Sequence, residues 1–258
     1  MSRTRIALAF ALPALFAAVP ASGQTRVAND GETAFKPGET LQFAVSYGPV
    51  PAGTMELRVV ERVVVGDRPA YHFASEVESN RAVSYVYQIE SREEAWLDAV
   101  RLHSLKYRRD SVEKGKPRDR EYTFDQARQV RIDADGEVKP TSPNAVDQLS
   151  MFYYLRLLPY DQGSRFTLRN QADPDDNPLT VRVVKRERVK VPAGTFDTWV
   201  VELGLETDSG VFKKGGDNRL WLTTDARHLP VKISSKVGLG NFQAELVSYE
   251  PGTASATR

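Results

Sequence analysis

One segment, Ala145–Leu158, constrains the fold more than any other, because it has helical length and apolar side chains on nearly every side. Arg156 is the only charged residue in its second half. Such a helix must be covered by other parts of the protein over most of its surface. At about 1.5 Å per residue it is roughly 20 Å long, which is too short to cross a bilayer. We expect a short internal helix, capped by Ser142 or Asn144 and ended by Pro159.

Stretches with the two-residue period of β-strands lie on both sides of this segment. They are separated by short polar turns, as in an antiparallel meander, and so many consecutive strands must curl to protect their edges. The sequence predicts a mostly β fold, an antiparallel meander forming an open or spiral β-barrel with one internal short helix. The predicted strands are 40–47, 55–65, 70–77, 91–98, 104–112, 118–124, 129–132, 165–168, 179–191, 195–203, 219–223, 230–237 and 242–249. For 80–89 a helix and a strand both fit, and we favour the helix.

The pentapeptide Val-Pro-Ala-Gly-Thr occurs twice, at 50–54 and 191–195, each time between predicted strands. Proline at its second position and glycine at its fourth fit a hairpin turn that ends in left-handed glycine. Recurrence of a favourable turn explains the match better than an internal duplication does. The residues expected to shape the two turns are Pro51, Gly53, Pro192 and Gly194.

The first 23 residues have the features of a secretory signal peptide. Arg3 and Arg5 precede an apolar run that ends at Ala21-Ser22-Gly23, and we expect cleavage after Gly23. Beyond it we expect a flexible lead-in at 24–37, a single β-barrel-like domain at 38–250 and a disordered tail at 251–258. The domain would have two halves, about 38–140 and 165–250, joined by the helix at 145–158.

Composition excludes several classes of function. The chain has no cysteine, which excludes a lipid-carrying cysteine, disulfides and thiolate metal sites. The 35 basic residues less Arg3 and Arg5 leave 33, against 34 acidic residues, so the mature chain lacks the excess of positive charge that nucleic-acid binders use. No second apolar span follows the signal peptide, and we expect a periplasmic protein without a transmembrane anchor.

Several motifs in the second half resemble a known family. They are Asp147–Ser150, Tyr153–Arg156, Val191–Phe196, Leu220–Thr223, Asp225 and Leu229–Val231. Together they resemble the bacterial envelope family called domain of unknown function 3108, over roughly residues 38–249. The resemblance implies an exported, mostly β protein of barrel-like or spiral form, and supplies no catalytic residues. The family pattern often has cysteine where Thr198 stands, so no thiol role is implied here.

Residues of catalytic type form no convincing constellation. The three histidines, at 72, 103 and 228, lack metal-ligand spacing. A triad of Ser150, Asp225 and His228 has no nucleophile elbow. Carboxylate pairs for glycoside hydrolysis can be drawn from Glu93, Glu94, Asp147 and Asp217, but no setting singles one out. We predict no catalytic residue, no metal and no cofactor.

The apolar helix then offers the best ligand site. Phe152, Tyr153, Tyr154 and Trp221 could line a cavity, with Arg156 holding an anionic group at its mouth. In the alternative, which we favour, the helix is a core plug and Arg156 pairs with an acid on a strand. We expect a non-enzymatic periplasmic envelope protein that binds a lipid or an acylated protein. The alternatives are an interaction scaffold for the envelope and a polysaccharide-active enzyme.

Overall fold

The structure is a computed structural model that describes residues 34–81, 89–113, 115–204, 217–237 and 240–253. Most of the helix expected at 80–89 lies outside these residues. Within them the chain forms one α-helix of eight residues, one 3₁₀ turn and fifteen strands. These are β1 (Thr40–Tyr47), β2 (Val50–Val65), β3 (Arg68–Ser79), β4 (Ile89–Asp98), β5 (Ser104–Glu113), β6 (Lys116–Pro117), β7 (Arg120–Asp125), β8 (Val130–Asp133), β9 (Val138–Pro140), α2 (Gln148–Leu155), β10 (Arg165–Leu168), η1 (Pro174–Asp176), β11 (Leu179–Val191), β12 (Gly194–Gly204), β13 (Asn218–Thr223), β14 (Pro230–Val237) and β15 (Gly240–Glu250).

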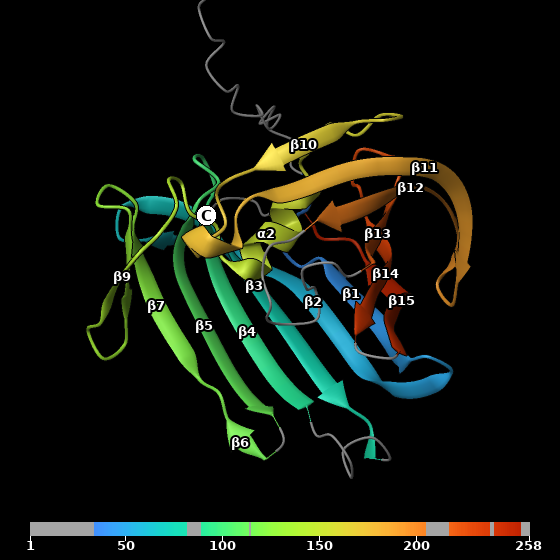
Figure 1. Ribbon diagram of the computed structural model, residues 1–258, viewed down its shortest axis with the longest axis horizontal. Helices are drawn as coiled ribbons and strands as arrows, with labels where there is room; N and C mark the ends of the chain where they lie inside the picture. Colours follow the sequence, from blue (N-terminus) through green and yellow to red (C-terminus); the bar gives the residue numbers. More distant parts are fainter. Residues whose placement is uncertain (1–33, 82–88, 114, 205–216, 238–239, 254–258) are drawn as a thin grey trace, which may run out of the picture.

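All strands belong to one antiparallel sheet. Its order is β10-β11-β12-β13-β14-β15-β1-β2-β3-β4-β5-β7-β8-β9, with β6 paired to β5. The sheet curls around α2 without closing, since β9 and β10 stand at its two ends (Figure 1). The predicted mostly β fold, an open barrel-like meander with one internal helix, is confirmed.

The chain between β9 and β10 bridges the two ends of the sheet. Val146 forms an isolated parallel bridge with Gln171, since its N–H donates to Asn170 O (2.7 Å) and its carbonyl accepts from Ala172 N (3.0 Å). On the other side, Ala145 O accepts from Ser104 N at the start of β5 (2.9 Å). We call the region where Ala145–Val146 lies between the start of β5 and residues 170–172 the seam. It is held by a few backbone hydrogen bonds where a closed barrel would have a continuous ladder.

The observed helix is shorter than the predicted one and begins at a different cap. Asp147 is the N-cap, and its carboxylate accepts from Ser150 N at 2.8 Å. Asn144, one of the expected caps, has a φ of 52°, whereas an N-cap residue needs extended backbone. After Leu155 the chain continues in turns with i to i−3 hydrogen bonds as far as Leu158, which makes the last predicted turn non-α-helical.

The core between α2 and the sheet is aromatic. The Tyr153 ring stacks on Phe73 of β3 at 3.9 Å between centroids, and Phe35 meets Tyr153 edge-on at 5.4 Å. Phe35 is fully buried, although it lies in the segment expected as a flexible lead-in. Within the described end of that segment, Phe35 is therefore part of the core, and Ala34 packs against it. The described start of the tail lies against this segment, since Thr253 N donates to Pro37 O (3.0 Å).

The first pentapeptide is not a turn, contrary to our expectation. Pro51 and Gly53 lie inside β2, and the connection from β1 is Gly48-Pro49. The register shifts here, because Val45 pairs with Gly53 while Ser46 pairs with Pro51, which makes the intervening alanine a bulge. A side chain at position 53 would clash with the backbone carbonyl of Glu78 in β3, so glycine allows the two strands to approach.

The second pentapeptide does form a hairpin turn. Pro192 and Ala193 connect β11 to β12, and Val191 pairs with Gly194 across the turn. Gly194 has a φ of +141°, a backbone conformation that suits glycine. The same five residues thus serve two structural purposes.

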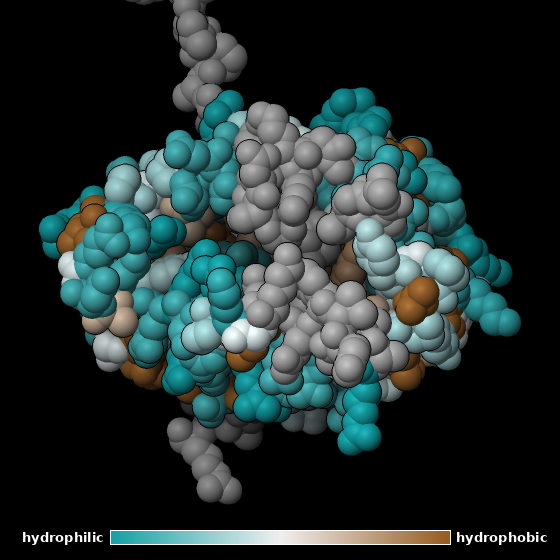
Figure 2. Space-filling model, turned by 60° about the horizontal axis from the view of Figure 1, so that its bottom comes forward, coloured by the Kyte–Doolittle hydropathy of each residue, from teal (hydrophilic) through white to brown (hydrophobic). Residues whose placement is uncertain are grey.

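The described surface is mainly hydrophilic. In the face shown in Figure 2, hydrophobic residues form small, separated groups. Exposed large apolar residues such as Tyr47, Val64 and Val138 belong to different strands. None of the described helices has the length and apolar composition needed to cross a membrane.

Candidate functional site

Arg156, the expected anion-binding residue, is buried and paired at the end of α2. Its guanidinium donates to the Glu39 carboxylate through Nη1 (2.5 Å) and Nη2 (3.1 Å). It also donates to the carbonyls of Ala34 (2.8 Å) and Arg227 (3.2 Å). Glu39 is equally buried and immediately precedes β1. This geometry matches the favoured alternative of a core plug and leaves the guanidinium little capacity for a ligand.

The other residues predicted to bind a ligand lie on two elements of the fold. Phe152, Tyr153 and Tyr154 are together on α2, where Tyr153 and Tyr154 are buried and Phe152 is partly buried. Trp221 lies in a different environment on β13. Its indole N–H donates to Glu187 Oε1 (2.5 Å), and the Lys232 ammonium is 5.7 Å from its ring. Trp221 belongs to the same hydrophobic core as Tyr153 and Tyr154, but the polar contacts of its indole are with Glu187 and Lys232.

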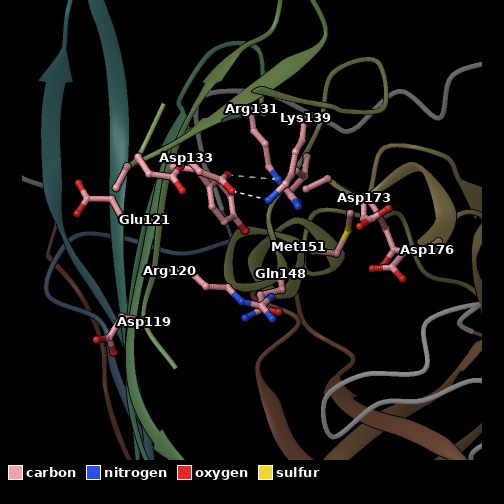
Figure 3. Close-up of a pocket in the computed structure, with 16 residues that line it drawn as sticks. Asp119, Arg120, Glu121, Arg131, Asp133, Lys139, Gln148, Met151, Asp173 and Asp176 are labelled. Atoms are coloured by element: carbon pink, nitrogen blue, oxygen red, sulfur yellow. Dashed lines mark hydrogen bonds and ion pairs between the residues drawn. The ribbon is translucent and has the colours of Figure 1, made fainter. Parts of the chain in front are cut away.

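A hollow lies at the seam, where the sheet fails to close. This seam cleft has a volume of about 660 Å³. It is lined by residues of β7, β8, β9 and the adjoining turns, by the start of α2 and by the segment 171–176 that contains most of η1. Figure 3 shows Arg120 extending toward Gln148 in the middle of the cleft, with Asp173 and Asp176 on the opposite wall.

Several charges of the cleft neutralise one another. Asp133 accepts from Lys139 Nζ at 2.7 Å and lies 3.7 Å from Arg131 Nε. Glu121 pairs with Lys106 at 2.7 Å, and Figure 3 shows it pointing away from the cleft. These ion pairs link β8 to β9 and β7 to β5, and they leave these side chains little charge for a ligand.

Other charged groups of the cleft have no ionic partner among the described residues. Arg120 makes no ion pair among the described residues. Its cross-strand neighbour in β5, Arg109, is also a cation and offers no partner. Asp135 accepts only a backbone hydrogen bond, from Glu137 N (3.0 Å), and Asp173 accepts one from Asp175 N (3.0 Å). The seam cleft thus presents one unpaired guanidinium and two unpaired carboxylates, while a further carboxylate without an ionic partner, Asp119, accepts from Ser111 N (3.2 Å) and points away from the cleft in Figure 3.

A hydrogen-bond network supports the floor of the cleft. Glu93 Oε2 accepts from the Tyr107 hydroxyl (2.9 Å) and from Gln148 Nε2 (3.1 Å), and Gln148 also donates to Tyr107. Burial, with the nearby Glu93 carboxylate, raises the pKa of Tyr107, so it stays protonated as a donor. The network fixes the first turn of α2 against β4 and β5.

Asp147 is fully buried beneath this network. The Ser104 hydroxyl and Ser150 N–H donate to its carboxylate, and its own N–H donates to Ser104 Oγ (2.8 Å). Burial raises the pKa of Asp147 to about 6, although the bonds from Ser104 and Ser150 act to lower it. Its charge has hydrogen-bond donors around it but no cation in contact.

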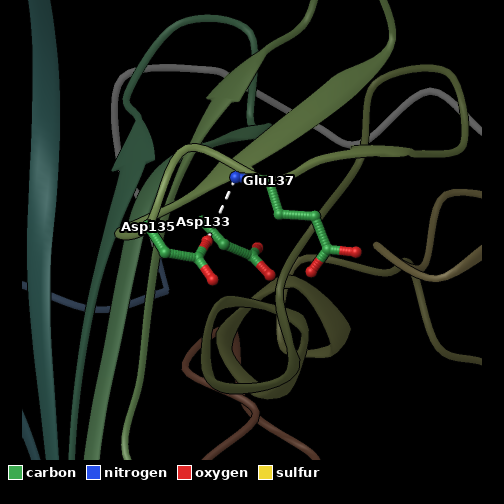
Figure 4. Close-up of side chains that lie close together, drawn as sticks. All are labelled: Asp133, Asp135 and Glu137. Atoms are coloured by element: carbon green, nitrogen blue, oxygen red, sulfur yellow. Dashed lines mark hydrogen bonds between the residues drawn. The ribbon is translucent and has the colours of Figure 1, made fainter.

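Three carboxylates in the β8–β9 hairpin, Asp133, Asp135 and Glu137, lie close enough to share a cation (Figure 4). Lys139 already supplies the positive charge, since its Nζ is 2.7 Å from Asp133 and 2.7 Å from Glu137. The backbone N–H of Glu137 occupies one oxygen of Asp135. These contacts explain why the three carboxylates lie close together, without a bound metal ion.

The residues of catalytic type that the sequence offered are engaged in separate places. His228 Nδ1 is 2.8 Å from Arg156 O, and Asp225 pairs with Arg227. His72 contacts Glu94 at 3.1 Å and stacks on Trp96. His103 is buried, with Nε2 3.1 Å from Arg68 Nη1, and burial lowers its pKa.

Sequence reasoning missed the seam cleft. Its walls come from residues 119–139 and 171–176, which are brought together only by the curvature of the sheet. The one available signal was the acidic, proline-bearing loop before β11, whose aspartates have no alternating basic residues to neutralise them.

A family model described as "Protein of unknown function (DUF3108)" matches residues 42–247. No curated protein matches the chain. Among solved structures, the chain is similar to a β-barrel-like protein of the domain of unknown function DUF1849 from Brucella abortus, with 10% identity, a TM-score of 0.48 and coverage of 84% of this chain and 98% of that one. A candidate lipoprotein from Parabacteroides distasonis has 10% identity and a TM-score of 0.35, and a candidate exported protein from Bacteroides fragilis has 13% identity and a TM-score of 0.35, both with the same coverages.

Proposed function

The chain belongs to DUF3108, a family of proteins of unknown function, and we propose that it is an exported periplasmic protein that binds an amphipathic envelope component without converting it chemically. The signal-peptide pattern of residues 1–23 supports export. The seam cleft is the binding site in this proposal, because the aromatic face of α2 is packed against the sheet.

The observation that carries the proposal is the cleft itself. It is a large hollow at the only place where the described sheet is not continuous, and it contains charged groups without ionic partners. Ligand sites are usually concave surfaces with a few convergent polar groups. The wall also has apolar parts, which Tyr122, Val146 and Met151 contribute. A ligand with a polar head and an adjoining apolar portion fits this combination.

The other two functions have less support. An interaction scaffold would use an exposed strand edge, but the edge strands β9 and β10 have only three and four residues, and short edge strands discourage pairing with another chain. A polysaccharide-active enzyme would need two accessible carboxylates on one groove. Asp147, the predicted carboxylate next to the cleft, is fully buried.

The test is to express the full chain with its own signal segment, purify it from the periplasmic fraction, and identify bound amphiphiles by solvent extraction and mass spectrometry. We expect close to one molecule of amphiphile to be bound to each molecule of purified protein. Ala172→Trp places a large side chain in the wall of the cleft and should remove it, whereas Ala127→Trp, on the exposed β7–β8 turn, should not.

Two results would contradict the proposal. One is a wild-type protein that is exported and carries no amphiphile. The other is an A172W protein that is folded by circular dichroism and carries as much amphiphile as A127W.

A further inference from the structure

We infer that the seam cleft recognises a zwitterionic group that carries one phosphate and one primary ammonium, as a phosphoethanolamine ester does. This inference rests on the proposed function and names the chemistry of the same site. That chemistry follows from Arg120, Asp135 and Asp173, which make no ion pair among the described residues, and from a second arginine on the strand next to that of Arg120.

The anion side of the cleft is formed by two arginines on neighbouring strands. Arg120 extends into the cleft and makes no ion pair among the described residues (Figure 3). Arg131 Nε is buried and donates no hydrogen bond within the described chain. A guanidinium presents a planar set of N–H donors that fits phosphate oxygens two at a time. A phosphate in the cleft would give the Arg120 guanidinium the ionic partner that it lacks, with Arg131 adding positive charge from the neighbouring strand although it already lies 3.7 Å from Asp133.

The cation side is formed by two carboxylates at the rim. Asp135 projects from the β8–β9 turn and Asp173 stands before η1, so they come from opposite sides of the seam. Each accepts one backbone hydrogen bond and has further lone pairs to accept from a ligand. An ammonium at this rim would be held by the charge of the carboxylates and by hydrogen bonds to their oxygens.

The cleft favours a primary ammonium over a quaternary one. A quaternary ammonium is usually recognised by the open faces of aromatic rings. Tyr122 is the only aromatic residue in the wall of this cleft as described, and the Arg131 guanidinium already lies over its ring, 5.1 Å from the centroid. Carboxylates gain hydrogen bonds only from an ammonium that has N–H groups. A choline head therefore lacks the contacts that an ethanolamine head would make.

The first experiment titrates the purified full chain with three soluble esters: glycerophosphoethanolamine, glycerophosphocholine and glycerophosphoglycerol. Binding is followed by calorimetry and by amide chemical shifts. We expect glycerophosphoethanolamine to bind about tenfold more tightly than either of the others, since glycerophosphoglycerol has no ammonium and the ammonium of glycerophosphocholine has no N–H to donate. Equal binding of all three esters, or binding of none, would overturn the inference.

Matched variants then locate the binding. Arg120→Ala should weaken binding of glycerophosphoethanolamine about tenfold, while Arg128→Ala, on the exposed β7–β8 turn, should leave it unchanged. Asp173→Asn preserves the cap of η1, because asparagine also accepts from a backbone N–H, and should weaken ethanolamine but not glycerol binding. Asp175→Asn is its control. Loss of affinity in the control variants to the same extent would place the ligand elsewhere.

A vesicle experiment distinguishes the source of the group. Phosphatidylcholine vesicles with and without phosphatidylethanolamine are sedimented with the protein. Retention only with phosphatidylethanolamine identifies a lipid headgroup, and no retention by either vesicle identifies a soluble ester. Both results agree with the inferred chemistry when glycerophosphoethanolamine binds at Arg120.

The failure of this inference can be told from failure of the proposed function. A protein that carries an amphiphile from the periplasm but shows no selectivity for glycerophosphoethanolamine overturns only the inference. A protein that carries no amphiphile overturns the proposed function, whichever ester it binds. A lysine-rich peptide is included in the titration as a fourth ligand. If it binds more tightly than all three esters, the inferred recognition of phosphate is wrong and the cleft is a site for ammonium groups at carboxylates.

Discussion

The two ends of α2 both bury a charge, and they do so in different ways. At the C-terminal end, Arg156 is neutralised by Glu39 in a bidentate pair with no access to solvent. At the N-terminal end, Asp147 is stabilised by hydrogen bonds from Ser104 and Ser150 and has no cation in contact. One end is electrically closed, while the other keeps a buried charge next to the seam cleft.

The difference separates a structural role from a binding role. A buried ion pair with satisfied hydrogen bonds has no remaining capacity for a ligand, so Arg156 orients the helix against the residues before β1. The N-terminal end lies beside unpaired charges and an open hollow, where a ligand can change the electrostatics. Breaking each end by mutation should therefore give different responses.

The largest effect is expected at the closed end. Arg156→Ala leaves the Glu39 carboxylate buried without a counter-charge, which should cost about 3–5 kcal/mol in the free energy of unfolding, measured by urea denaturation. Arg188→Ala, which breaks the exposed pair with Asp197, serves as control and should hardly change the midpoint.

If Arg156→Ala does not fold, the double variant Arg156→Met with Glu39→Gln keeps the comparison testable. It removes both charges at once and should recover much of the lost stability. If Arg156→Ala lowers the free energy of unfolding no more than Arg188→Ala does, the buried pair of Arg156 with Glu39 is not needed to neutralise the C-terminal end of α2.

The next effect is a pH dependence at the open end. The pKa of Asp147 is raised to about 6 in the folded protein from 3.8 in the unfolded chain, so the folded state binds this proton more tightly. The resulting stability is fully present below pH 4 and is lost as the pH rises through 6, by about 3 kcal/mol in total. Asp147→Asn keeps a capping oxygen but does not titrate.

Urea denaturation of wild type and D147N at a series of pH values tests this. The stability of D147N relative to wild type should rise by roughly 2 kcal/mol or slightly more between pH 4 and pH 7.5. Other titrating groups are common to both proteins, so the difference reports on Asp147. A difference that stays constant over this range would show that the Asp147 carboxyl has an ordinary pKa.

The smallest effect is expected from one donor of the open end. Ser104→Ala removes the hydroxyl that donates to Asp147 and should cost about 2 kcal/mol at pH 7.5, and less at pH 4, where the carboxyl is protonated. It should also raise the pKa of Asp147, since this hydrogen bond lowers it. Ser248→Ala, which removes a bond to Gln42 at the surface, should have little effect at either pH. An equal cost at both pH values would argue against a charged acceptor.

Local patterns in the sequence were sufficient for most of the strands and for the position of α2, but they missed the two shortest strands, β6 and β9. Alternation marks strands with one buried face, and a helix that is apolar all round has to be internal. The N-cap was harder to predict, because Ser142, Asn144 and Asp147 are all good capping residues. Only the backbone conformation, with Asn144 at a φ of 52°, decides between them.

Contacts that are distant in sequence could not be predicted from local patterns. Glu39 is 117 residues from Arg156, in a polar stretch that gives no sign of burial, and Phe35 is a single apolar residue in the same stretch. The turn wrongly expected at 50–54 failed for a related reason. Gly53 lies inside a strand because the backbone of Glu78, in the neighbouring strand β3, comes too close for any side chain, and the local sequence around position 53 does not show this contact.

The pairing of β1 with β15 places the two ends of the folded chain next to each other in the middle of the sheet. The strand order is therefore the chain order rotated, with β10 first and β9 last. A circular permutant that joins the residues near Pro37 and Thr253 and opens between β9 and α2 could keep every strand pairing. Its new termini would emerge at the seam, where the chain would be free to attach the cleft to another module or to a surface.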